Sequence, residues 1–189
     1  YAFITPSLVW PRLAAVLWSG ALAYLVKRIA EAAGARRWQA VSAALIVALY
    51  GPLVFYGGEL LPTSLAVFLT TCALWLAIKP TPRKIDSGLS GILTGLAALA
   101  VGPALLILPA VAWAESRRSY RRAALCTICA LATVGTATAR NVAESGEWIP
   151  ISANGGINLW IGNNPQGDSL TAVRPGAAWE KLVQEPESL

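Results

Sequence analysis

Amide and glycine residues gather in the C-terminal part of this 189-residue chain. The cluster consists of Asn154, Gly155, Gly156, Asn158, Gly162, Asn163 and Asn164. An amide side chain both donates and accepts hydrogen bonds, and glycine lets the backbone approach a ligand closely. This combination suits the hydroxyl groups of a sugar. Because Asn-Gly and Asn-Pro are also common turn formers, a set of turns without a ligand is the alternative interpretation.

Two arginines stand at the expected outer ends of apolar segments. Arg12 lies near the start of the first segment, and Arg140 follows the last one, directly before Asn141. A guanidinium group binds phosphate oxygens in pairs, so both arginines are candidates for holding a lipid phosphate. The alternative is that they extend to the membrane surface without binding a ligand.

Glu59 is the third candidate, since it is the only charged residue between two apolar segments. An ionisable group in such a position predicts a role in binding a substrate hydroxyl, an amine or a basic partner such as Arg12. Capping of an interfacial turn is the alternative. The chain has no histidine, and its carboxylates are sparse, so we predict no metal site and no cofactor; a divalent cation is compatible with the chain but not supported by it.

The composition predicts a membrane protein. Hydrophobic residues make up 56% of the chain and charged residues 13%, which is too little polar surface for a soluble globule. The net charge of +5 comes from local clusters of Lys and Arg, a pattern typical of cytoplasmic loops rather than of nucleic-acid binding. The chain has no methionine, and we expect it to be an internal fragment.

Apolar segments of about 20 residues predict spanning helices. We predict a transmembrane helical domain over residues 1–139, with spans at 8–26, 38–58, 60–78 and 123–139 and a short hairpin at 88–114. Eleven of the fifteen Lys and Arg residues then lie in three loops on one side, which the positive-inside rule makes cytoplasmic. One long kinked span at 88–114 is the alternative, but it would place Arg117, Arg118, Arg121 and Arg122 outside. Gly91 and Gly95 form a small-xxx-small face that suits packing of this segment against another helix. Residues 140–189 are predicted to begin a truncated outer domain of mixed structure, with a strand at 157–161 and a short helix after Pro175.

The string RNVAESGEWIPISANGGINLWIGNNPQGD, residues 140–168, resembles a segment of a known membrane-enzyme family. The family is that of bacterial polytopic glycosyltransferases related to the dolichyl-phosphate-mannose protein mannosyltransferases and the lipid A aminoarabinose transferase. The strings LYGPLVFYGGELLPTSLAVFL and GLSGILTGLAALAVGPALLILP are similar to its helices. In that family a similar arginine-asparagine pair follows a transmembrane helix, so the resemblance implies that Asn141, beside Arg140, is a substrate-binding residue.

This resemblance implies a fold, an activity and a location. The fold is an all-α polytopic transmembrane bundle of the glycosyltransferase C type in the bacterial inner membrane, with the C-terminal segment outside. The activity is transfer of a sugar from a polyprenyl-phosphate donor to a protein, lipid or glycan acceptor. The family's catalytic acid is expected in an outer loop upstream of Tyr1, so no catalytic residue is assigned in this chain. The alternatives are a carrier or flippase for lipid-linked sugars, which the interruption at Gly102 and Pro103 favours, and a noncatalytic membrane scaffold.

Overall fold

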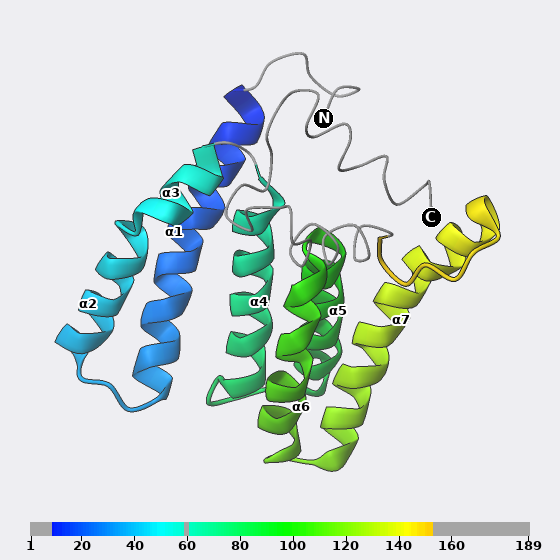
Figure 1. Cartoon of the computed structure of the whole chain (residues 1–189). Helices are drawn as coiled ribbons and strands as arrows, with labels where there is room; N and C mark the ends of the chain where they lie inside the picture. The colour runs from blue at the N-terminus through cyan, green and yellow to red at the C-terminus, as the bar shows by residue number, and fades with distance from the viewer. Residues whose placement is uncertain (1–8, 59–60, 153–189) are drawn as a thin grey trace, which may run out of the picture. The chain divides into compact units, whose positions relative to one another are not determined.

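The computed structural model describes residues 9–58 and 61–152 (Figure 1). The chain divides into two units, residues 1–150 and 151–189, and every helix below belongs to the first unit. In chain order the elements are α1 (Val9–Ala32), α2 (Arg37–Ala48), α3 (Gly51–Gly58), α4 (Pro62–Ile78), α5 (Lys84–Ala100), the 3-10 helix η1 (Gly102–Ile107), α6 (Leu108–Ser116) and α7 (Tyr120–Ser145). No β-strand occurs among the described residues, so the all-α prediction is confirmed for them. The predicted strand at 157–161 and the helix after Pro175 lie outside these residues.

Two helices are long and apolar enough to cross a membrane. These are α1, with 24 residues, and α7, with 26 residues. A third candidate span exists if α2 and α3 are taken together as one bent element, while α4 and the segment of η1 and α6 are apolar but shorter. The length and composition of these helices support a membrane protein with two or three candidate spans.

The predicted span at 38–58 is divided in the structure. α2 ends at Ala48 and α3 begins at Gly51, and their axes differ by 45°. The break comes directly before Gly51 and Pro52, where the proline ring lacks an amide donor and disfavours helical backbone in the preceding residue. A continuous apolar segment therefore becomes two short helices with a bend between them.

Segment 88–114 forms a hairpin rather than one continuous helix. α5 ends at Ala100, the chain turns through η1, and α6 returns beside α4 and α7 (Figure 1). The hydroxyl of Ser87, in the first turn of α5, donates a 2.9 Å hydrogen bond to Glu115, in the last turn of α6. The start of α5 and the end of α6 therefore lie at the same end of the unit.

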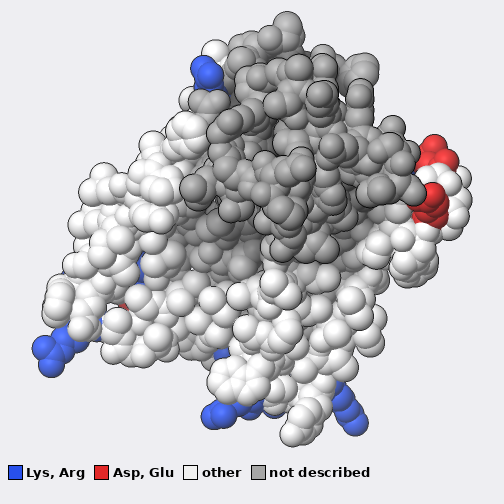
Figure 2. All heavy atoms as spheres, viewed as in Figure 1, with Lys and Arg blue, Asp and Glu red and all other residues white. Residues whose placement is uncertain are grey.

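All three basic loops lie at one end of the first unit, which we call the basic end. Arg118 donates a 2.7 Å hydrogen bond to the Lys79 carbonyl, and Arg122 donates a 3.2 Å bond to the Pro82 carbonyl, so loops 117–119 and 79–83 are joined. The guanidinium of Arg28, near the end of α1, lies 5.1 Å from the ring centre of Trp75 in the last turn of α4. Figures 1 and 2 show these loops together at the bottom of the view, where Lys and Arg side chains gather.

Helix α5 is the centre of the packing. It contacts α4 on one side and α7 on the other more extensively than any other helix pair does. Small residues make this possible, because a Cβ atom on Gly91 would lie 2.1 Å from the Cys126 carbonyl oxygen, and one on Gly95 would lie 2.6 Å from Thr133 Cβ. The predicted small-residue packing face at Gly91 and Gly95 is confirmed, and its partner is α7.

Candidate functional site

A cavity of about 520 Å³ opens between α1, α2 and α3. Ligand-binding cavities in proteins commonly enclose about 300–1,000 Å³, so this one is large enough for part of an elongated ligand. Its described lining is mostly apolar and includes residues from both sides of the α2–α3 bend, namely Val47 and Ala48 before the bend and Leu53 and Val54 after it. The bend thus creates the cavity wall opposite α1.

Glycine and serine shape the wall between α1 and α3. Gly57 lies close to α1, since a Cβ atom there would be 3.6 Å from the Ser19 hydroxyl. That hydroxyl donates a 2.7 Å hydrogen bond to the Ala15 carbonyl in its own helix. With its donor used in this way, Ser19 contributes little polarity, and the cavity presents a surface suited to hydrocarbon.

Arg12 is the only charged residue in the described lining of the cavity. It lies in the first turn of α1, at the end of the first unit opposite the basic end. Its side chain is exposed and forms no ion pair with a described residue. An apolar cavity with one guanidinium group beside it fits an amphipathic molecule with an anionic head.

The end of α7 holds the second group of predicted site residues. The Asn141 amide donates a 3.0 Å hydrogen bond to the Ile149 carbonyl, and the Thr138 hydroxyl lies 2.8 Å from the Pro150 carbonyl, to which it donates. Gly146 ends the helix in the left-handed conformation, with φ of 73°, which lets the chain reverse. Asn141 therefore fixes the backbone that leads toward the amide and glycine cluster.

Arg140 does not line the cavity beside Arg12. Its side chain is exposed, near the same end of the unit as Arg12. However, α7 packs against α5 and α6, whereas α1 packs against α2, α3 and α4. The two arginines thus belong to separate groups of helices, and only Arg12 lines the cavity.

The remaining predicted site residues are outside the described part of the chain. They are Glu59, Asn154, Gly155, Gly156, Asn158, Asn163 and Asn164. Gly58, which directly precedes Glu59 in sequence, lines the cavity. The assignments of these residues stay predictions.

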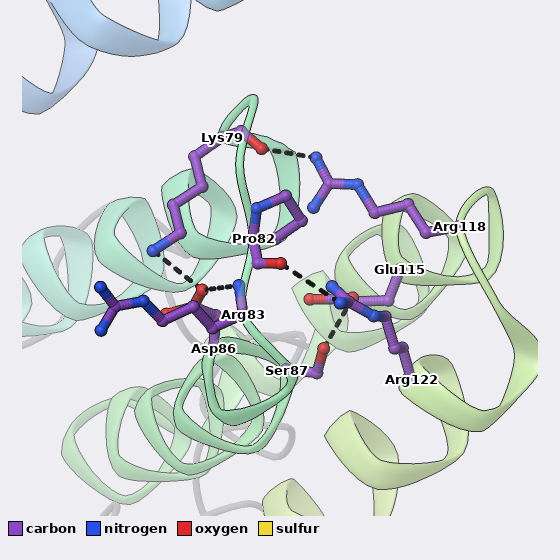
Figure 3. Close-up of polar contacts among 8 residues, drawn as sticks. All are labelled: Lys79, Pro82, Arg83, Asp86, Ser87, Glu115, Arg118 and Arg122. Atoms are coloured by element: carbon purple, nitrogen blue, oxygen red, sulfur yellow. Dashed lines mark hydrogen bonds and ion pairs between the residues drawn. The ribbon is translucent and has the colours of Figure 1, made fainter.

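Sequence reasoning missed a buried polar cluster at the basic end (Figure 3). Glu115 is fully buried; Ser87 donates to one of its carboxylate oxygens, and the other has no hydrogen-bond partner among the described residues. One terminal nitrogen of Arg122 is likewise buried and without such a partner. An acid inside an otherwise apolar helix was the available signal, since α6 contains no other charged residue.

Asp86 is the second acid of this end and is 5% exposed. Lys79 Nζ lies 2.9 Å from its carboxylate, and the Arg83 backbone N–H donates to the same oxygen. Burial alone would raise the pKa of Asp86, but the hydrogen bonds from Lys79 and Arg83, with their positive charges, outweigh burial and lower the pKa. Asp86 therefore joins α4 to the start of α5 as a carboxylate.

The described residues contain no candidate metal site. No three of their His, Cys, Asp or Glu side chains lie close enough together to hold a metal ion. Cys72, Cys126 and Cys129 are all free thiols. Among the described residues, the cavity beside Arg12 is the candidate site for binding a ligand.

Comparison of the chain with known protein families, with curated proteins and with solved structures finds no match.

Proposed function

We propose that the chain is part of a polytopic membrane glycosyltransferase of the C type, which uses a polyprenyl-phosphate-linked sugar on the outer face of the bacterial inner membrane. The observation that carries this proposal is the apolar cavity beside Arg12. Its wall suits isoprenoid hydrocarbon, and its single guanidinium group suits the phosphate. When the cavity and Arg12 lie toward the outer face of the membrane, the basic end faces the cytoplasm, as the positive-inside rule requires.

The segment after α7 supports the same proposal. Arg140 and Asn141 begin the string that resembles the glycosyltransferases, and Asn141 and Thr138 hold residues 149–150 against the end of α7. In sequence, this attachment comes shortly before the segment that contains Asn154 to Asn164. In the proposed function those amides contact the sugar, Glu59 binds a substrate hydroxyl or amine, and the catalytic acid comes from outer sequence upstream of Tyr1.

Binding of a photoreactive polyprenyl phosphate to the purified protein tests the proposal. We expect crosslinks on α1 and α3, and we expect competition by unlabelled polyprenyl phosphate but much less by the uncharged polyprenol. Arg12→Gln should weaken binding about 10-fold or more, since a charge-assisted hydrogen bond contributes about 1.5–3 kcal/mol. Arg36→Gln, which removes an exposed arginine from the basic end, is the matched control and should have no effect. Equal competition by polyprenol, or unchanged binding in Arg12→Gln, would contradict the proposal.

A carrier for lipid-linked sugars is the second candidate. The 45° break between α2 and α3 borders the cavity, and broken helices beside a binding site are typical of transporters. Two measurements on the full-length protein in vesicles separate the candidates. Sugar transfer to an acceptor favours the enzyme, whereas movement of the intact labelled lipid across the bilayer without transfer favours the carrier.

A further inference from the structure

The basic end carries a large excess of positive charge. Eleven basic and three acidic residues of the described chain lie there, which leaves an excess of eight positive charges. The three acids are Glu31, Asp86 and Glu115. Glu31 pairs with Lys27 and Arg28, Asp86 pairs with Lys79, and Glu115 is buried against Ser87. None of the three is left to neutralise the surface.

Two of the arginines join neighbouring loops into one surface, which we call the platform. Arg118, in the loop before α7, donates to the carbonyl of Lys79, and Arg122, in the first turn of α7, donates to the carbonyl of Pro82 (Figure 3). These bonds join loop 117–119 and the start of α7 to loop 79–83. Basic residues that are far apart in sequence are thereby held on one surface.

Four exposed basic residues remain on this platform, and we call them the cationic patch: Arg83, Lys84, Arg117 and Arg121. None of their side chains forms an ion pair with a described residue. Arg121 lies in the first turn of α7, which contains no acid, so the positive end of the helix dipole adds to the charge of the patch. Asp86 lies beside Arg83 but is already paired with Lys79, so the patch keeps a net positive charge.

Aromatic side chains border the patch. The Arg117 guanidinium lies 5.5 Å from the ring centre of Trp113, which is 64% exposed, and Tyr120 is 86% exposed. Exposed Trp and Tyr beside basic residues are typical of the level of lipid headgroups in a membrane. A soluble anion would not require aromatic residues at this position.

We infer that the cationic patch binds the headgroup of an anionic phospholipid of the cytoplasmic leaflet. Charge complementarity selects a phosphate-bearing headgroup without a compensating amine, and Trp113 and Tyr120 favour a headgroup that remains attached to its bilayer. The inference rests on the membrane orientation of the proposed function but not on glycosyl transfer. If Arg12→Gln left polyprenyl-phosphate binding intact while the patch bound lipid, the proposed function would fail and this inference would stand.

Native mass spectrometry of the detergent-purified full chain, titrated with phosphatidylglycerol or phosphatidylcholine, tests the inference. We expect phosphatidylglycerol to be retained in preference to phosphatidylcholine. The double variant Arg117→Gln/Arg121→Gln should bind phosphatidylglycerol roughly 25-fold more weakly, because each basic residue near an anionic membrane surface contributes about fivefold. Arg117→Lys/Arg121→Lys should keep most of the binding, since the charge is retained.

The matched control is Arg36→Gln/Arg37→Gln, which removes two exposed arginines from the same end but at the start of α2. We expect it to change binding less than about threefold, because Arg36 and Arg37 are outside the platform. Equal losses in the two Gln variants would overturn the inference, since they would show a response to total charge alone. Absence of a preference for phosphatidylglycerol would also overturn it, as would full competition by inorganic phosphate, which would assign the patch to a soluble anion.

Discussion

The hydroxyl of Ser87 donates a 2.9 Å hydrogen bond to the carboxylate of Glu115, and neither side chain is exposed. The two residues are 28 positions apart, on α5 and α6, and the bond closes the hairpin at the basic end. A buried carboxylate with one unpartnered oxygen costs free energy, whereas its bond to Ser87 recovers part of that cost. The pair therefore determines where α6 ends relative to α5 more than it adds net stability.

A double-mutant cycle on this pair measures the coupling. Ser87→Ala should lower the free energy of unfolding by about 1.5–3 kcal/mol, because it removes a hydrogen bond to a charged group. In a Glu115→Gln background the same change should cost only about 1 kcal/mol, since the acceptor is then neutral. Unfolding of the purified protein in detergent, followed by circular dichroism, gives both values.

Ser90→Ala is the control for this cycle. Ser90 lies one turn further along α5 and donates a 2.8 Å hydrogen bond to the Ala73 carbonyl rather than to Glu115. Its replacement should cost the same in both backgrounds. A Ser87→Ala cost that did not change with Glu115→Gln would disprove the coupling.

The lowered pKa of Asp86 predicts a loss of stability in acid. The folded protein favours the carboxylate more than the unfolded chain does, so this contribution is complete above the ordinary Asp pKa of about 4 and is lost as the pH falls through the lowered folded value. At neutral pH, Asp86→Asn should be less stable than the unchanged protein by about 1–3 kcal/mol. The difference should shrink toward zero below about pH 4. Thermal unfolding midpoints across this pH range test the prediction, and a constant difference would refute it.

The hairpin shows what sequence patterns could predict. Gly102 and Pro103 interrupt an uncharged segment, and four arginines follow its end, so a reversal was needed to keep them beside the other basic loops. The structure has this reversal, with η1 at the turn. Small-residue spacing also predicted the packing face at Gly91 and Gly95, because close helix approach requires residues without a bulky side chain.

The cavity and the bond between Ser87 and Glu115 could not be predicted from the sequence, because both depend on contacts between residues far apart in the chain. Hydropathy is smooth across residues 38–58, so the break before Gly51 is not seen in a spanning-helix pattern, although Gly51 and Pro52 are a local signal for it. The cavity depends on that break and on the packing of α3 against α1. Likewise, Glu115 acquires its partner only when the hairpin closes, and no local pattern specifies Ser87.

The close approach of α5 to α7 predicts a strong effect of one methyl group. Gly91→Ala should destabilise the protein by about 3 kcal/mol or more, because the new Cβ would lie 2.1 Å from the Cys126 carbonyl oxygen and the two helices would have to separate. Gly88→Ala is the matched control on the same helix, since its nearest contact would be an ordinary 3.7 Å from Cys129 Sγ. That change should be neutral or stabilise by up to about 1 kcal/mol through helix propensity. Similar unfolding midpoints for the two variants would contradict the packing.

Limited proteolysis tests the attachment of the segment after α7. Asn141→Ala and Thr138→Val each remove a hydrogen bond to the backbone at 149–150, so each should release this segment at a cost of about 1 kcal/mol. Digestion with a protease that cleaves after glutamate should then cut faster at Glu147, which lies in the released loop. Arg140→Ala changes an exposed neighbour that makes neither bond and should leave the cleavage rate unchanged. If all three variants were cut at the rate of the unchanged protein, Asn141 and Thr138 would not be what holds the chain as it leaves α7.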